Sequence, residues 1–378
     1  MAKRVLVLGG GFGGIAAAVH LRSLAPEAEV VLADRGTHFK MGFRKSMEIA
    51  GHGTIAEGSR PLAALERHGI RVVRGEIAMI DPTMRGAVVG GEMIDADAML
   101  VALGAHGDPG AVPGFAEHGL DVYGSGVARA AETMATIAGG RIVIGILGSP
   151  YPCSPAPFEL ALLLEEATRT RGAKVSLTVF TPLPSSLPVV GPSGCEAIEG
   201  RMAGRFIDFF ANTKAERIEA GSVIVAGGAA IPFDVLLGVP GHVPPLVLAE
   251  AGLTGPGGWV TVNPGTLQTA ADGVWAVGDC VGMQLADGKP MPKAGVIAEN
   301  AGLVAAERIA AFLRGEESDA RWNGEGGCYL ETGDGEAMMV RGRFLADPPD
   351  VTLTPPSREN LDAKHRYERE RLAAWFGE

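Results

Sequence analysis

The sequence predicts an α/β protein built on parallel sheets, and two stretches carry this prediction. The chain opens with an apolar strand, a glycine-rich turn and a helix, all between Arg4 and Leu24. The same order of elements returns between Arg141 and Glu166. Strand, turn and helix in this order are typical of parallel sheets. The 55 glycines among 378 residues suit the tight turns of such a protein.

The first turn carries a G-x-G-x-x-G pattern between the strand Arg4–Leu8 and the helix Ile15–Leu24. Glycines at these places allow a tight turn, a close approach of the backbone to a pyrophosphate, and a close contact between helix and strand. The cofactor-binding residues predicted in this turn are Gly9, Gly11, Phe12, Gly13 and Gly14. The arrangement predicts a Rossmann-like unit that binds a dinucleotide.

An acidic residue follows the second strand, at the position where a dinucleotide-binding unit carries one. The second strand, Glu29–Ala33, ends at Asp34, 20 residues after Gly14. A carboxylate at this place accepts hydrogen bonds from the adenosine ribose. We therefore expect Asp34, with its neighbour Arg35, to contact the cofactor.

The next segments are expected to complete the first pass through this domain. His38–Gly53 is polar and irregular and is expected to be a loop near the cofactor. Pro61–His68 predicts a short helix and Arg71–Arg74 a strand. Met99–Leu103 is a buried strand that ends in a turn at Gly104.

The second strand–turn–helix departs from dinucleotide binding at its turn. Pro150 and Pro152 stand where a small residue should let a pyrophosphate reach the helix, and proline adds bulk and lacks an N–H donor. The loop presents Cys153 instead. The strand Lys174–Phe180 has no acid at its end for a nicotinamide ribose. Two departures therefore indicate a degenerate second site.

The remaining strands and helices are predicted from the same patterns of apolar residues and turns. Ile231–Gly238 is expected to return the chain to the first domain, and Ala271–Cys280 gives a turn, a strand and the acid Asp279. The predicted helices are Val127–Ala138, Glu196–Ala211, Gly295–Leu313 and a charged helix that ends in Trp375 and Phe376.

Composition and charge limit the class of function. The formal net charge of −11 argues against a nucleic-acid partner. The four cysteines lack C-x-x-C spacing, which argues against a disulfide scaffold and against a metal site. The first strand starts close to Met1, so we expect no signal peptide and a cytoplasmic protein. No apolar run approaches the roughly 18–20 residues of a membrane span, so at most peripheral membrane contact is expected.

Several segments resemble the FAD-binding elements of the two-dinucleotide flavoprotein reductases. They are the N-terminal glycine turn, Leu103–Gly104, Val277–Asp279 and Pro292–Gly295. The likeness covers nearly the whole chain and implies FAD as the cofactor.

Two cysteine segments are the most specific part of the resemblance. Gly148–Glu159 (GSPYPCSPAPFE) and Gly327–Gly333 (GCYLETG) are similar to segments of the sulfide:quinone oxidoreductases and of the flavin subunit of flavocytochrome c sulfide dehydrogenases. The resemblance implies that Cys153 and Cys328 are the redox-active pair beside the flavin. It also implies that sulfide, or a related sulfur species, is the substrate.

The resemblance extends to individual flavin-binding positions. Asp279 matches the acid that binds the ribityl chain, and Lys293 matches a residue at the isoalloxazine ring. Without the resemblance, a surface position for Lys293 would be as well supported as a position at the flavin. The other expected flavin-binding positions in these segments are Gly104, Gly278 and Gly295. Some members attach FAD through a further cysteine, but Gly42 and its neighbours offer none, so non-covalent FAD is expected.

The family pattern implies a division of the chain into four segments. The FAD domain comprises residues 1–108 and 231–315, interrupted by a degenerate Rossmann-like domain over 109–230. Residues 316–378 form a small C-terminal interface domain, and a homodimer is one possible assembly.

The expected chemistry is thiol–disulfide exchange coupled to a flavin. Hydrosulfide attacks a Cys153–Cys328 disulfide and leaves a persulfide on one sulfur and a thiolate on the other. Glu159, near the start of a helix, is a candidate for moving protons. Cys195 and Cys280 are expected to be small buried apolar residues.

Two rival functions remain open at this point. One is an NAD(P)H-dependent FAD reductase, against which the damaged second turn counts. The other is a non-catalytic flavoprotein, which predicts that serine at Cys153 and Cys328 leaves function intact. The acceptor is also open between a quinone and another redox carrier. Leu372, Trp375 and Phe376 suggest a small apolar membrane anchor.

Overall fold

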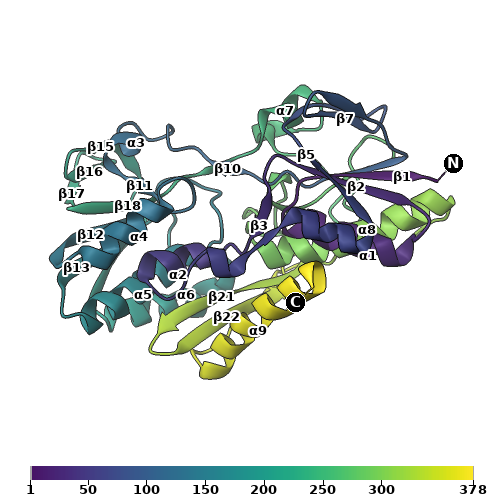
Figure 1. Cartoon of the computed structure of the whole chain (residues 1–378). Helices are drawn as coiled ribbons and strands as arrows, with labels where there is room; N and C mark the ends of the chain where they lie inside the picture. Colours follow the sequence, from purple (N-terminus) through teal and green to yellow (C-terminus); the bar gives the residue numbers. More distant parts are fainter. Residues whose placement is uncertain (1, 378) are drawn as a thin grey trace.

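A five-stranded parallel sheet forms the centre of the first unit. In this computed structural model, which describes residues 2–377, the strand order is β20-β9-β1-β2-β5 (Figure 1). The strands are β1 (Arg4–Leu8), β2 (Glu29–Asp34), β5 (Ile70–Arg74), β9 (Ala98–Val101) and β20 (Val274–Ala276). All neighbouring pairs are parallel. The strand before Asp279 therefore joins the sheet that begins at Arg4, as the sequence predicts.

Two helices, α1 (Phe12–Leu24) and α8 (Gly295–Arg314), pack side by side against this sheet (Figure 1). Their backbones approach closely because glycines meet at the contact: a Cβ at Gly302 would lie 2.4 Å from the carbonyl oxygen of Gly13. The first unit also holds a small antiparallel sheet of β6 (Ile77–Asp81), β7 (Gly86–Val89) and β8 (Glu92–Ile94), with α7 (Leu246–Glu250) beside it.

A second five-stranded parallel sheet has the order β11-β18-β12-β13-β14. Its strands are β11 (Leu120–Asp121), β12 (Gly139–Ile146), β13 (Lys174–Phe180), β14 (Ile207–Phe210) and β18 (Val235–Val239). Its helices are α3 (Phe115–His118), α4 (Val127–Thr136), α5 (Ala156–Thr170) and α6 (Gly191–Ala203). A three-stranded antiparallel sheet accompanies it, made of β15 (Ala215–Glu219), β16 (Ser222–Val225) and β17 (Ala230–Pro232).

Strand β18 corrects one sequence prediction. Ile231–Gly238 was expected to return the chain to the first domain, but β18 pairs with β12 from Ile142 to Ile146 inside the second sheet. The boundary at residue 230 is therefore too early. The chain crosses between the units on a two-stranded antiparallel ribbon of β10 (His106–Gly107) and β19 (His242–Val243) (Figure 1).

Two predicted segments differ from the structure, one in its type and one in where it ends. His38–Gly53 is not an irregular loop: it contains β3 (His38–Lys40), paired with β4 (Ser59–Pro61), and helix α2 (Arg44–Ala50). Helix α2 is short, and its packing against α4 and α5 stabilises it more than local propensity does. The helix predicted to reach Ala211 ends at Ala203, since the next residues pair with β13 as β14.

Within residues 2–377, five short 3-10 helices complete the connections. They are η1 (Ala56–Gly58), η2 (Leu62–His68), η3 (Pro188–Val190), η4 (Pro256–Gly258) and η5 (Gly278–Cys280).

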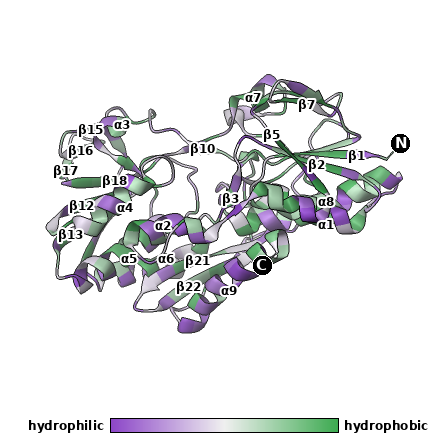
Figure 2. Cartoon of the chain, viewed as in Figure 1, coloured by the Kyte–Doolittle hydropathy of each residue, from purple (hydrophilic) through white to green (hydrophobic). Residues whose placement is uncertain are grey.

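The C-terminal unit is an antiparallel sheet covered by one helix. Its elements are β21 (Glu325–Gly333), β22 (Glu336–Arg343), β23 (Asp350–Leu353) and α9 (Arg358–Phe376). Strands β1 and β12 are mainly hydrophobic, whereas α9 is mainly hydrophilic (Figure 2). The Ser357 side chain caps α9 by accepting a hydrogen bond from the Asn360 backbone N–H.

The end of α9 is buried, which overturns the expectation of an apolar membrane anchor there. Leu372, Trp375 and Phe376 are each no more than 5% exposed. The ring centroids of Phe39 and Trp375 lie 5.4 Å apart, and those of Phe12 and Trp375 lie 6.0 Å apart. This apolar end therefore anchors the C-terminal helix to the first unit. Among residues 2–377, no helix has both the length and the apolar character that crossing a bilayer requires.

Candidate active site

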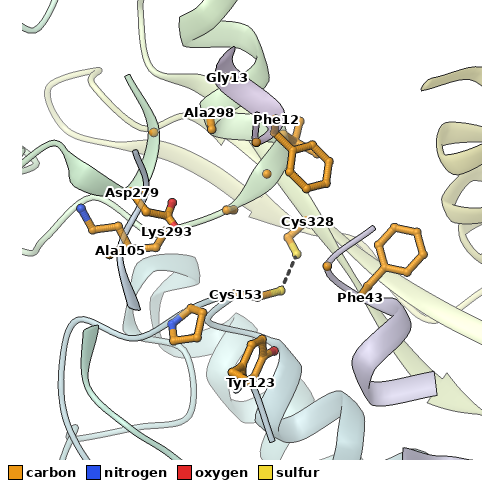
Figure 3. Close-up of a pocket in the computed structure, with 18 of the residues that line it drawn as sticks. Phe12, Gly13, Phe43, Ala105, Tyr123, Cys153, Asp279, Lys293, Ala298 and Cys328 are labelled. Atoms are coloured by element: carbon orange, nitrogen blue, oxygen red, sulfur yellow. Dashed lines mark hydrogen bonds between the residues drawn. The ribbon is translucent and has the colours of Figure 1, made fainter. Parts of the chain in front are cut away.

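A cavity of about 470 Å³ lies where the three units meet. Its walls come from the N-terminal ends of α1 and α8, from α2, from the loop between β12 and α5, from the β10–β19 ribbon and from β21. Figure 3 shows Cys153 and Cys328 pointing toward one another across this space. Segments that are far apart in sequence therefore supply one site.

The N-terminal glycine turn forms one wall of the cavity. Gly9 has a φ of 111°, and a Cβ at Gly14 would lie 2.0 Å from the Gly9 carbonyl oxygen, so larger residues do not fit there. Gly11, in contrast, has no atom within 4 Å of the place its Cβ would take, and it lines the cavity together with Phe12 and Gly13. Helix α1 begins here without a side-chain cap. The turn thus leaves an open cradle of helix N–H groups that fits a pyrophosphate.

Asp34 contacts this turn directly. Its Oδ2 accepts a hydrogen bond of 2.7 Å from the Gly10 N–H, and its Oδ1 accepts one of 2.6 Å from the Gly36 N–H. Arg35 is exposed and lies 3.8 Å from the Glu76 carboxylate. Asp34 therefore orders the glycine turn and keeps further lone pairs for a ribose, whereas Arg35 points to solvent.

The other expected flavin-binding residues line the cavity beside the same glycine turn. Gly104 has a φ of 64° and open space where its Cβ would stand. Gly278 borders the cavity, and Gly295 lies so close to the Phe12 ring that its Cβ would meet a ring carbon at 2.8 Å. Burial raises the pKa of the Asp279 carboxyl, and the Lys293 ammonium opposes that effect.

Lys293 is a buried residue and not a surface lysine, with 6% of its surface exposed. Its Nζ donates to the Val281 carbonyl oxygen at 2.6 Å and lies 4.2 Å from the centroid of the Trp259 ring. Burial lowers the pKa of this ammonium, and Asp279 and Cys280 partly offset the effect. The Lys293 carbonyl oxygen accepts a 2.8 Å bond from the Cys153 N–H, which ties the two predicted site residues together.

The thiols of Cys153 and Cys328 lie 3.4 Å apart, sulfur to sulfur, and are not disulfide-bonded. Cys328 is on β21, and Cys153 is in the loop before α5 with a φ of 45°, a backbone conformation that costs energy for a non-glycine residue. The hydrogen bond with Cys328 and burial raise the pKa of the Cys153 thiol well above its usual value. The pair is thus at a distance from which a disulfide can form with a small movement.

The other two cysteines are buried away from this pair. Cys195 is 5% exposed on α6, and its thiol donates to the Ser185 hydroxyl. Cys280 is fully buried, and burial raises the pKa of its thiol to about 11.

Glu159 lies on α5 in a buried ion pair. Its Oε2 is 2.9 Å from Lys364 Nζ and accepts a 2.9 Å bond from the Glu331 N–H. Its Oε1 is buried without a hydrogen-bond partner. Burial raises the pKa of the Glu159 carboxyl, while Lys364 opposes the shift. Lys364 itself borders the cavity, so it stands between the cavity and Glu159.

Several cavity residues were not singled out from the sequence. Among them are Lys45, His106, Tyr123, His242 and Lys364. Each comes from a different stretch, and none carries a local motif that would have marked it. Only the fold brings them to the cysteine pair. Within residues 2–377, no cluster of three metal-ligating side chains is present.

The turn of the second sheet is closed to a pyrophosphate. A Cβ at Gly148 would lie 2.9 Å from the Gly241 Cα, so the β19 side of the crossing ribbon packs against this turn. Helix α5 begins only at Ala156, and the preceding loop bends back so that Cys153 meets Lys293. The first turn therefore fits a dinucleotide, and the second does not.

A family model described as pyridine nucleotide-disulphide oxidoreductase matches residues 3–302 of the chain. A sulfide-quinone reductase from Aquifex aeolicus is 28% identical, over 96% of this chain and 87% of its own length. A mitochondrial sulfide:quinone oxidoreductase from Schizosaccharomyces pombe is 23% identical, over 92% of this chain and 82% of its own length.

The solved structures show the same fold. The sulfide:quinone oxidoreductase of Aquifex aeolicus superposes with a TM-score of 0.89 at 24% identity, over 100% of this chain and 92% of that one. A NAD-dependent persulfide reductase from A. fulgidus gives a TM-score of 0.68 at 20% identity, over 90% of this chain and 64% of that one. These matches confirm the predicted fold class and the resemblance to the sulfide:quinone oxidoreductases.

Proposed function

We propose a function from the premise that the chain belongs to the pyridine nucleotide-disulphide oxidoreductase family. The protein oxidises sulfide through Cys153 and Cys328 and passes the electrons through FAD to a quinone. The family is one of flavin-dependent oxidoreductases, and the relatives above are named for sulfide and quinone. The observation that carries the proposal is the 3.4 Å separation of the two sulfurs inside a cavity that also holds the glycine turn.

The residues present fit FAD. The α1 N-terminus at Gly11 would hold the pyrophosphate, Asp34 the adenosine ribose and Asp279 the ribityl chain. Bound FAD supplies an acceptor for two electrons that can be passed on to a second substrate. Cys153 and Cys328 are the cysteines among the cavity-lining residues, which supports a non-covalent cofactor.

The cysteine pair performs the sulfur chemistry. In the oxidised protein, hydrosulfide attacks one sulfur of the Cys153–Cys328 disulfide; the S–S bond breaks, one cysteine becomes a persulfide and the other a thiolate. A second nucleophile, hydrosulfide or a small thiol, then takes the outer sulfur and frees the second thiolate. Re-forming the disulfide releases two electrons, so each cycle oxidises one sulfide by two electrons.

Other residues hold charge and protons around this pair. The Lys364 ammonium lowers the pKa of the Cys153 thiol, whereas the Glu159 carboxylate raises it. Glu159 is in contact with Lys364, which supports a role for this pair in moving protons to and from the cavity. Lys293 would place its positive charge beside the site of reduction.

The rival functions make different use of the same fold. An NAD(P)H-dependent reductase needs a second dinucleotide site, and Pro150, Pro152 and the close packing at Gly148 count against one. A non-catalytic flavoprotein gives no reason for two free thiols at 3.4 Å in the main cavity.

The test is steady-state turnover of the FAD-loaded protein. Sulfide with a short-chain quinone should give quinone reduction, and NADH with the same quinone should not. Turnover with NADH but not with sulfide would replace the proposal by the reductase. Turnover with neither donor would favour the non-catalytic flavoprotein.

A further inference from the structure

Lys45 is a cation of the cavity that the proposed reaction leaves without a role. It lies on α2, is half-buried, and lines the cavity near Cys153. Its Nζ donates to the Tyr123 carbonyl oxygen at 2.7 Å and lies 5.3 Å from the centroid of the Tyr123 ring. Figure 3 shows Tyr123 next to Cys153, on the side of the cavity away from Phe12 and Gly13.

No carboxylate of the described residues lies within ion-pair distance of the Lys45 ammonium. Lys364, by comparison, lies 2.9 Å from Glu159 and 2.8 Å from Glu331. Asp121 is near Lys45, but its Oδ1 accepts hydrogen bonds from the Tyr123 and Gly124 N–H groups. One carbonyl satisfies one of the three N–H groups of an ammonium. A half-buried cation with spare donors in a cavity is a place for an anion.

Among the neighbouring polar groups, Asp121 also lines the cavity, and its carboxylate partly offsets the lowering of the Lys45 pKa by burial. His106 and His242, from the β10–β19 ribbon, also line the cavity. His242 Nδ1 is buried without a hydrogen-bond partner, so a protonated ring would bury an unpaired N–H. Burial together with Lys293, Lys45 and His106 lowers the pKa of His242 to about 4, which keeps the ring neutral. Lys45 is therefore the ammonium group that an incoming anion meets on this side of the cavity.

We propose that Lys45 binds the substrate sulfur species as an anion, the hydrosulfide ion, and holds it beside Cys153. The chain as a whole carries a net charge of −11, which repels anions. A local cation at the reacting thiols offsets this repulsion for the incoming hydrosulfide ion. The glycine turn of α1 lies on the other side of the cavity and is assigned to the cofactor. The identity of the anion rests on the proposed sulfide chemistry, whereas the anion site itself does not.

The test compares two alkylating agents that differ in charge. Iodoacetate is an anion and iodoacetamide is neutral, and both react with the same thiols. The FAD-loaded protein is reduced with dithiothreitol, freed of the reductant, and alkylated without oxygen; peptide mass spectrometry then gives the rate at Cys153 for each agent. The ratio of the two rates reports the attraction of the cavity for anions and is independent of sulfide turnover.

In Lys45→Met the ratio of iodoacetate to iodoacetamide rates should fall about fivefold to tenfold, as expected for the loss of one partly screened charge. Lys45→Arg should keep most of the ratio. The matched control is Lys174→Met, which removes an exposed lysine of β13 outside the cavity and should leave the ratio unchanged. Lys45→Gln serves as a second variant if Lys45→Met does not fold.

The sulfide concentration that gives half-maximal flavin reduction should rise by a similar factor in Lys45→Met. An unchanged alkylation ratio in that variant, or an equal fall in Lys174→Met, would overturn the inference even if the protein oxidises sulfide. A fall confined to the Lys45 variants in a protein that sulfide does not reduce would keep the anion site and refute the proposed function.

Discussion

The Lys364 ammonium lies 2.9 Å from the Glu159 carboxylate and 2.8 Å from that of Glu331, and Lys364 is fully buried. This contact joins three elements, because Lys364 is on α9, Glu159 on α5 and Glu331 on β21. The C-terminal unit is therefore fixed to the second sheet at the same place where β21 supplies Cys328.

Replacing Lys364 by Met should destabilise the protein by about 3–5 kcal/mol, because two buried carboxylates lose their cation. Urea unfolding measures this free energy. The matched control, Arg343→Met, breaks the exposed ion pair with Asp350 and should cost no more than about 1 kcal/mol.

Adding Glu159→Gln and Glu331→Gln to Lys364→Met should restore most of the lost stability, since no buried charge is then left unpaired. If Lys364→Met alone unfolded at the same urea concentration as the wild type, the ion pair would not hold the units together.

Gly11→Val should fold normally but bind FAD about tenfold or more weakly. The backbone of Gly11 has an ordinary φ of −90°, and nothing in the protein lies where its Cβ would stand. The side chain would occupy the cradle, and overpacking costs about 1–3 kcal/mol. Flavin content after purification and the dissociation constant from FAD titration measure the effect.

Gly200→Val is the control, because Gly200 is exposed on α6 and also has open space at its Cβ. It should keep its FAD. Equal flavin affinity in Gly11→Val and the wild type would place the pyrophosphate elsewhere.

His242 should make the protein less stable in acid. Its pKa is lowered from 6.5 to about 4 by burial and by Lys293, Lys45 and His106. The unfolded chain binds a proton near pH 6.5 that the folded ring does not take up until about pH 4, so this contribution to stability is present above pH 6.5 and is lost as the pH falls toward 4.

Between pH 7 and pH 5 the wild type should lose about 2 kcal/mol that His242→Gln does not lose. Urea unfolding of both proteins at the two pH values measures the difference. The same loss in both proteins would mean that the folded ring titrates normally.

The parts of the fold that local pattern controls could be predicted from the sequence. The strand, glycine turn and helix from Arg4 to Leu24 and the acid at Asp34 are all local patterns, and the structure forms them as expected. The degenerate second turn could also be recognised, because proline restricts its own φ angle and lacks an N–H donor in any fold. The loop predicted over His38–Gly53 contains α2 instead, because tertiary contacts stabilise that short helix.

Residues that act through distant contacts could not be predicted from local pattern. No local pattern indicates that β18 pairs with β12 in the second sheet, or that Trp375 packs on Phe39. Cys153 and Cys328 could be named from the resemblance, but their approach to 3.4 Å is a property of the fold. Lys45 carries no motif at all; its significance lies in the half-buried position that α2 gives it. Whether the protein forms a dimer stays a prediction.

The most direct test of the central claim is an anaerobic titration of the FAD-loaded protein with sulfide, followed by the flavin absorbance. With sulfide as the sole nucleophile, we expect two equivalents of sulfide to bleach one flavin in the wild type, because one is oxidised and the second removes the outer sulfur. We expect no bleaching in Cys153→Ser or in Cys328→Ser. The control Cys195→Ser, at a buried cysteine away from the pair, should bleach as the wild type does. Full bleaching in both serine variants of the pair would contradict the account, because sulfide would then reach the flavin without these two thiols.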